Sequence, residues 1–194
     1  IMRFGRWLYA TSEGAATVLD DAYKSWAKVL LGAAPWRSWA TSYGELGWIC
    51  SGIGRAVIDI AGRRADLWNL SAEDLYHRVF VMSHTTSGIT WAKKSINILD
   101  CWGIVDWPDW QKGTIDVYKQ YVKAAVIQKC SVGWHNAISR HVLPVPYVNC
   151  RPHVSADLRL GMDLVLLWCS LRLRRSFGRL RAGLLCFGHL NGNH

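Results

Sequence analysis

The sequence predicts an all-α fold, an irregular bundle of about six to eight helices, because its segments have helical periodicity and are bounded by capping and helix-stopping residues. Apolar residues recur with the spacing of a helix face along most of the chain. Capping residues, glycines and prolines separate these segments, and no alternating apolar and polar run is long enough for a strand. With 51% hydrophobic and 19% charged residues, the composition is that of a globular protein.

The first expected helix carries an apolar stripe over residues 15–30 and follows Ser12, a candidate N-cap. Glycine and proline within residues 32–35 are expected to end it. An aromatic connector over residues 36–48 then leads into a second helix, whose stripe covers residues 53–68.

A capping motif and a glycine delimit the next two expected helices. Residues 71–74, Ser-Ala-Glu-Asp, resemble a capping box with Asp in place of Glu and open a helix with its stripe over residues 75–82. A further helix is expected over residues 90–102, where Gly103 ends it.

The helical pattern continues beyond this glycine. Residues 106–109 predict a turn and a helix start, and a long amphipathic helix is expected over residues 115–126. A short helix is expected over residues 134–142.

A proline-rich segment divides the chain into two expected parts. Pro144 and Pro146 push the residues before them out of the helical region, so residues 143–155 should form an extended crossover. We therefore expect a helical bundle over residues 1–142. The remainder, residues 143–194, should be this linker followed by a basic helical segment.

The net charge of +9 is uneven along the chain. Residues 1–150 contain 16 basic and 12 acidic residues, whereas residues 151–194 contain seven arginines, two aspartates and no lysine. Five of these arginines form the Arg cluster: Arg172, Arg174, Arg175, Arg179 and Arg181. The first, third and fourth of these would share one helix face. Planar guanidinium groups favour phosphate, so we expect nucleic-acid binding here. A solvated helix face and an anionic membrane surface are the alternatives.

Tryptophan is unusually abundant, with 12 residues. Five of them lie in the connector and near the predicted turn: Trp36, Trp39, Trp48, Trp107 and Trp110. Such rings can stack on nucleic-acid bases, or they can supply apolar surface between helices. Packing is the role that we favour for them, and stacking stays open.

No catalytic residue is predicted. Asp20 and Asp21 lie inside the first helical stripe, with Lys24 one turn further on, and not beside the tight turn that a two-metal polymerase site requires. Zinc-protease, serine-hydrolase and phosphate-loop motifs do not occur in the sequence.

The six cysteines form no CxxC pair and predict reduced thiols in an intracellular protein. Cys186, His189 and His194 have a spacing like half a zinc knuckle, but three ligands do not close a structural zinc site. We therefore expect neither metal nor cofactor in this chain. The longest apolar run, residues 164–171, is too short to cross a membrane.

Four blocks resemble the region after the polymerase palm in non-LTR (LINE-type) retrotransposon reverse transcriptases. They are residues 30–48, with Leu-Leu-Gly, Pro and Gly-Glu-Leu-Gly-Trp, and residues 63–68, 102–107 and 179–184. The resemblance implies a helical thumb and linker that grip template and primer. It further implies an upstream palm domain that uses Mg and a zinc module downstream. The palm's aromatic-Ala-Asp-Asp motif, the zinc module and any endonuclease signature are absent from the sequence.

We therefore expect a non-catalytic fragment of such an enzyme, nuclear in location, that holds RNA or an RNA–DNA duplex mainly through phosphates. The start at Ile1 agrees with a fragment. Two alternatives stay open. One is a stand-alone helical protein-interaction module with a Trp-rich surface, and the other is a decayed element whose product has no function.

Overall fold

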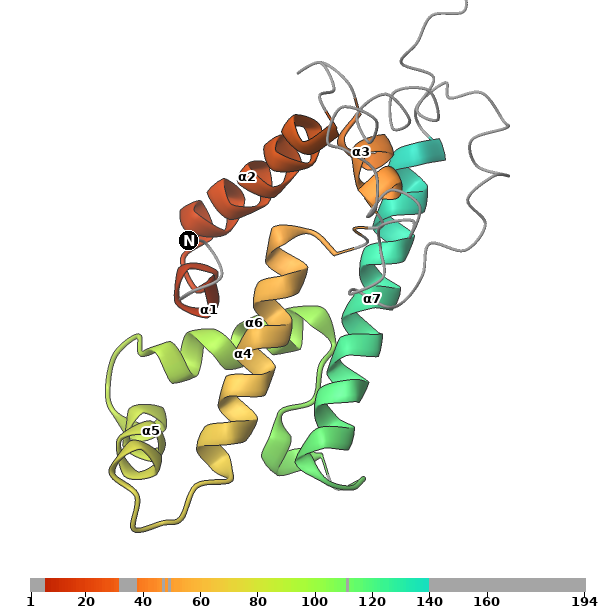
Figure 1. Ribbon diagram of the computed structural model, residues 1–194. Helices are drawn as coiled ribbons and strands as arrows, with labels where there is room; N and C mark the ends of the chain where they lie inside the picture. The colour runs from red at the N-terminus through yellow and green to blue at the C-terminus, as the bar shows by residue number, and fades with distance from the viewer. Residues whose placement is uncertain (1–5, 32–37, 47, 49, 111, 140–194) are drawn as a thin grey trace, which may run out of the picture. The chain divides into compact units, whose positions relative to one another are not determined.

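The computed structural model describes residues 6–31, 38–46, 48, 50–110 and 112–139 (Figure 1). Within these residues every regular element is a helix and no strand occurs. The predicted all-α fold is confirmed. The expected crossover over residues 143–155, and with it the boundary between the two expected parts, lies outside the described residues.

The described elements, in chain order, are α1 (Arg6–Tyr9), α2 (Glu13–Leu31), α3 (Trp39–Leu46), α4 (Gly52–Trp68), α5 (Leu75–Thr85), α6 (Trp91–Trp102), the 3₁₀-helix η1 (Trp107–Asp109) and α7 (Ile115–Ser139). They divide into two compact units. The first unit takes residues 1–21 and 50–130, and the second takes residues 22–49 and 131–194.

Side-chain caps fix the ends of α4 and α6. Ser51 Oγ accepts a hydrogen bond from the Gly54 N–H at 3.1 Å, and Thr90 Oγ1 accepts one from the Lys93 N–H at 3.4 Å. Gly103 follows α6 with a φ of 69°, in the left-handed region that favours glycine. The predicted start and stop of this helix are confirmed.

The start of α5 corrects the predicted capping box. The N-cap is Asp74, whose Oδ1 accepts from the Tyr76 N–H at 2.7 Å, and not Ser71. Ser71 instead stabilises the turn before the helix. Its Oγ accepts from the Glu73 N–H at 3.3 Å, and its carbonyl accepts from the Asp74 N–H at 2.9 Å. Because Ser71 takes part in this turn, it does not cap the helix. The helix therefore begins three residues later than the predicted capping box implies.

Two predicted breaks are helical in the structure. Most of the aromatic connector over residues 36–48 is α3, because Trp39 and Tyr43 share one helix face and pack edge to face at 5.1 Å. The short helix expected from Trp134 is the continuation of α7, which runs without a break to Ser139. Trp134 Nε1 donates to the Ala40 carbonyl of α3 at 2.7 Å, and this bond ties both helices together inside the second unit.

The core of the first unit forms around α4, which contacts α1, α5, α6 and η1 (Figure 1). Small side chains on α4 allow these neighbours to approach closely. The buried side chains of this core are Ala56, Val57, Ile60, Ala61 and Ala65 of α4, Ala92 and Leu99 of α6, and Tyr118, Val122 and Val126 of α7. The helical stripe that predicted α4 is therefore its buried face.

A buried ion pair links three of these elements. Arg64 of α4 has no exposed surface, and its Nε and Nη2 donate to the two carboxylate oxygens of Asp106 at 2.9 and 2.5 Å. Its Nη1 donates to the Ala92 carbonyl and the Ser95 hydroxyl of α6, each at 2.7 Å. The guanidinium carbon also lies 5.3 Å from the centroid of the Phe80 ring of α5. One side chain thus fixes α4 against α6 and against the segment before η1.

Replacing Asp106 by Ala should lower the free energy of unfolding by about 3–5 kcal/mol, because the Arg64 guanidinium would stay buried without its counter-ion. Urea unfolding followed by circular dichroism measures this loss. The matched control is Asp66→Ala, which breaks the ion pair with Lys119. That pair joins half-exposed side chains at 2.6 Å, so its loss should cost less than about 1 kcal/mol. Equal losses in the two variants would contradict the role of the buried pair.

Candidate functional site

The Arg cluster lies outside the described residues. The same holds for Trp36 and for the weak zinc candidates Cys186, His189 and His194. The predicted site residues that the structure describes are the remaining tryptophans: Trp39, Trp48, Trp107 and Trp110.

Trp39 and Trp48 belong to an aromatic cluster of the second unit. Tyr43 is fully buried at its centre, with ring centroids 5.1 Å from Trp39 and 6.0 Å from Trp48. Trp48 also lies 6.1 Å from the ring of Tyr23, and the Lys24 ammonium lies 5.8 Å from the Trp39 centroid. Both indoles pack against their neighbours, and each stays half-buried.

Trp107 and Trp110 pack around Tyr118 in the first unit. Their ring centroids lie 5.4 and 5.3 Å from that of Tyr118. Trp110 also stacks on Tyr121, with centroids 5.9 Å apart and planes 24° apart. Only 9% of Trp110 is exposed, so its faces are not open to a base. Packing is therefore its role in this fold, whereas Trp107 keeps a partly exposed ring.

The Asp20–Asp21 pair lies in the unbroken helix α2, as the sequence predicts. Asp20 is half-buried and Asp21 is exposed, and each has an interaction partner. Within the described part of the chain, no group of three or more His, Cys, Asp or Glu side chains could hold a metal ion. The prediction that this pair lies within a helix is confirmed.

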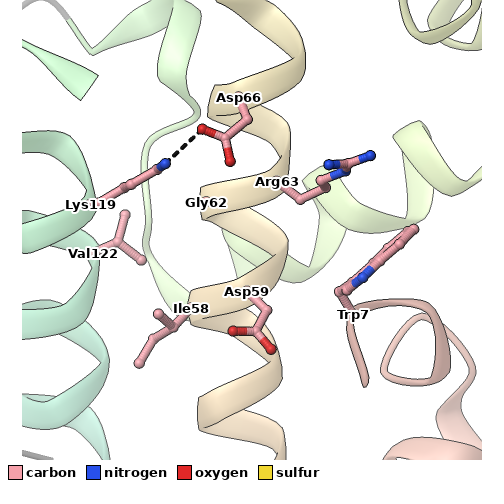
Figure 2. A pocket seen from close by; sticks show the side chains of 8 residues that line it. All are labelled: Trp7, Ile58, Asp59, Gly62, Arg63, Asp66, Lys119 and Val122. Carbon is pink, nitrogen blue, oxygen red and sulfur yellow. Dashed lines mark hydrogen bonds and ion pairs between the residues drawn. The ribbon is translucent and has the colours of Figure 1, made fainter. Parts of the chain in front are cut away.

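A hollow of about 330 Å³ opens along α4 in the first unit (Figure 2). Its lining comes from α4 (Ile58, Asp59, Gly62, Arg63 and Asp66), from α1 (Trp7) and from α7 (Lys119 and Val122). The α4 positions recur at helical spacing, so one face of the helix supplies most of the wall. Gly62 deepens it, since a Cβ there would find only Lys119 Cε within 4 Å, at 3.9 Å.

Charges within the hollow are balanced. Lys119 Nζ donates to Asp66 Oδ1 at 2.6 Å (Figure 2). The Arg63 guanidinium lies 6.0 Å from the centroid of the Trp7 ring, and Asp59 also has an interaction partner. Two carboxylates and two cations cancel, so this surface does not attract a polyanion. The hollow has the size of a small-ligand pocket, but its charged groups already engage one another.

The apolar stripe predicted over residues 75–82 lies at the surface. Leu75, Val79 and Met82, here called the α5 row, are 68%, 57% and 63% exposed. Phe80 is the buried side chain of this helix, and its ring packs on Trp68 with centroids 5.1 Å apart. Periodicity finds the row, but it does not reveal that the aromatic side of the helix faces inward. The α5 row is thus an apolar surface that sequence reasoning missed.

The fold opposes protonation of His84 on the same helix. Its ring centroid lies 5.5 Å from that of Trp68 and 4.9 Å from that of Phe80. Burial among these rings, and then the nearby Arg64 guanidinium, lowers the pKa of His84 below its ordinary value. The charged form of this histidine is therefore disfavoured in the folded state.

Comparisons with protein-family models, with curated proteins and with solved structures find no match to this chain. Among the described helices, none is long and apolar enough to cross a membrane.

Stability should fall on acidification in a manner that depends on His84. Because the pKa of His84 is lower in the folded chain, the unfolded chain binds more protons once the pH drops below about 6.5. The stability that neutral His84 contributes to the folded chain is fully present above that pH, and it is lost as the pH falls toward the folded pKa. We expect the urea midpoint to decrease between about pH 7.5 and about pH 5.5, and to decrease less in His84→Gln. Exposed His135, replaced by Gln, is the control and should keep the wild-type slope. The same slope in all three proteins would rule the interpretation out.

Proposed function

We propose that the chain is a non-catalytic, nucleic-acid-gripping segment of a retroelement reverse transcriptase, and that it holds RNA or an RNA–DNA duplex through phosphates. The observation that carries this proposal is the charge asymmetry. Residues 151–194 hold seven arginines against two aspartates, a net charge of +5 out of +9. Arginine without lysine favours bidentate contact with phosphate oxygens.

In the first unit, two cations are already paired with carboxylates. Arg64 is paired with Asp106 in the core, and Lys119 is paired with Asp66 at the hollow. Cations engaged in this way contribute little to the attraction of a polyanion. Residues 151–194 carry +5 of the net charge of +9 in only 44 residues, and the proposal assigns phosphate contact to the Arg cluster within them.

The blocks of resemblance supply a second argument. Residues 63–68 and 102–107 contain the two partners of the buried pair, Arg64 and Asp106. Trp68 of the first block packs on Phe80, and Trp107 of the second packs on Tyr118. Residues of these two blocks thus help to hold helices together, which is expected when a helical scaffold is the shared property.

Under this proposal the chemistry lies outside the chain. An upstream palm domain would hold the Mg ions of the polymerase, and a zinc module would follow downstream. The chain itself would act in the nucleus by positioning template and primer, with little sequence preference, because phosphate contacts carry no base information.

The Arg cluster is tested by replacing Arg172, Arg175 and Arg179 with Gln. If about three phosphates are contacted at once, the slope of log affinity against log salt should flatten by about two to three. Affinity should fall for all duplex sequences alike. Titration of duplex RNA at two salt concentrations, read by fluorescence anisotropy, measures both quantities.

The matched control removes three cations elsewhere, in Lys94→Gln, Arg78→Gln and Lys112→Gln. These side chains belong to α6, to α5 and to the segment before α7. The net charge changes equally, so a general field effect would weaken both triple variants to the same extent. Equal weakening, or no change after removal of the three cluster arginines, would sink the proposal.

A stand-alone protein-interaction module is the second candidate, and the α5 row favours it. Large exposed apolar patches mark binding surfaces in soluble proteins. Trp39, Trp48, Trp107 and Trp110 each pack against another aromatic ring. An interaction surface is therefore better supplied by the exposed Leu75, Val79 and Met82. If the chain fails to bind duplex, protein interaction would take the place of nucleic-acid binding as its function.

The double variant Val79→Ser, Met82→Ser separates the two candidates. Both side chains are exposed, so the free energy of unfolding should change by no more than about 0.5 kcal/mol each. Binding of the apolar dye ANS should decrease, while duplex RNA affinity stays at the wild-type value. A loss of RNA affinity here would place the nucleic-acid contact on α5 and contradict its assignment to the Arg cluster.

A further inference from the structure

The hollow along α4 is open where one side chain is absent. On the face of α4 that lines it, Gly62 lies between Asp59 and Asp66 (Figure 2). Those two aspartates are seven residues apart, which is about 10 Å along the helix axis. Between them the helix presents its backbone, since a Cβ on Gly62 would have only Lys119 Cε within 4 Å, at 3.9 Å. A flat molecule can therefore lie against this face of α4.

An aromatic ring of α1 forms another side of the hollow. Trp7 is half-buried, and its carbonyl accepts a hydrogen bond from Trp91 Nε1 at 3.3 Å. Its ring also packs edge to face with that of Trp91, with centroids 5.2 Å apart. These contacts hold the Trp7 indole in place at the hollow, so it is a preformed surface on which a flat ring can stack.

The Arg63 guanidinium is near the Trp7 ring but not in stacking contact with it. Its carbon lies 6.0 Å from the ring centroid, whereas carbon atoms in direct contact lie about 3.5–4.0 Å apart. A flat ring between the two groups needs about 7 Å, twice that contact distance. Because Arg63 is exposed, a shift of about 1 Å is enough to admit such a ring.

The charges at the hollow favour a neutral ligand. An anion would meet Asp59 and Asp66, and a cation would meet Arg63 and Lys119. Lys119 Nζ already donates to Asp66 Oδ1 at 2.6 Å, so neither group of this pair is a ready counter-ion. A neutral N–H donor avoids both repulsions. A carboxylate has about four acceptor positions, so Asp59 can accept from such a donor besides its existing partner.

A flat shape, no net charge and N–H donors along one edge are the properties of a nucleobase. Guanine carries two neighbouring donors, at N1 and N2, that match the two oxygens of one carboxylate. We propose that the hollow binds an unpaired guanine base, stacked between Trp7 and Arg63 with its N–H edge on Asp59. The base can belong to a free nucleoside or to an unpaired nucleotide of an RNA strand, because the contacts are the same. This inference goes beyond duplex binding by the Arg cluster and does not depend on it.

Guanosine, which is uncharged, is the probe, and saturation-transfer NMR with the full chain measures its binding. In 1-methylguanosine a methyl group replaces the N1 proton, so this nucleoside should bind about tenfold more weakly or worse. Trp7→Leu removes the stacking surface and should weaken guanosine binding by about tenfold. Asp59→Asn, which leaves one acceptor oxygen, should weaken it to a similar extent, by about tenfold.

A matched pair of glycine substitutions separates a blocked hollow from a damaged fold. Gly62→Met would fill the hollow and should abolish guanosine binding. Methionine is a better helix former than glycine and the surroundings of Gly62 are open, so the thermal midpoint should not fall. Gly133 of α7 is exposed, and a Cβ there would meet nothing within 4 Å. Gly133→Met is therefore the control, and it should bind guanosine as the wild type does.

Two further arms identify the source of the base and test its independence from the Arg cluster. A short uridine strand with one guanosine should bind more tightly than guanosine if the base comes from RNA. It should bind more weakly if the ligand is the free nucleoside, because its phosphates would meet Asp59 and Asp66. Replacement of Arg172, Arg175 and Arg179 with Gln should lower duplex affinity and leave guanosine affinity unchanged.

Four results would overturn the inference. One is the absence of saturation transfer to guanosine, and another is equal binding of 1-methylguanosine. The third is guanosine binding that persists in Gly62→Met. The fourth is displacement of guanosine by choline, which would show that the Trp7 ring serves an organic cation.

Discussion

The buried guanidinium of Arg64 is the constraint on which the first unit depends. A buried charge must be paired, and the planar guanidinium of arginine donates its hydrogen bonds only in fixed directions. The Asp106 carboxylate accepts hydrogen bonds from Nε and Nη2, while the Ala92 carbonyl and the Ser95 hydroxyl of α6 accept from Nη1. The rotation of α4 about its own axis is thereby set. Because of that rotation, Arg63 points into the hollow and Gly54 faces Cys130.

The same constraint explains why the aromatic side chains gather where they do. Phe80 lies against the guanidinium, and Trp68 and His84 pack around Phe80, so α5 must turn its aromatic side inward. Its other apolar side, the α5 row, is then left at the surface. Because α5 already buries its Phe80 side, the α5 row adds little buried apolar surface to the fold. It follows that the exposed row is a consequence of how α5 docks and not of a weak core.

Periodicity and caps predict most of the helices because those signals are local. Thr90, Gly103 and the stripe of α4 are examples in which neighbouring residues decide the outcome. Long-range partners are not encoded locally. Nothing near Arg64 in the sequence marks Asp106 as its partner, and nothing near Gly54 marks Cys130 of α7 as its neighbour. The tryptophans illustrate the limit, since composition cannot tell a packed ring such as Trp110 from an open one. The Arg cluster stays a sequence-based prediction.

Positive charge is unevenly divided between residues 1–150 and residues 151–194. Residues 1–150 carry a net +4, from 16 basic and 12 acidic residues, whereas the 44 residues from 151 to 194 carry a net +5. In the first stretch several cations already have partners: Arg64 has Asp106, Lys119 has Asp66, and Lys129 donates to the Cys101 carbonyl. Two aspartates cannot neutralise seven arginines in the second stretch. Counter-ions must therefore come from outside the chain. Under the proposal that the chain binds nucleic acid, the phosphate backbone would supply them at fixed spacing, and the release of small ions would favour binding entropically.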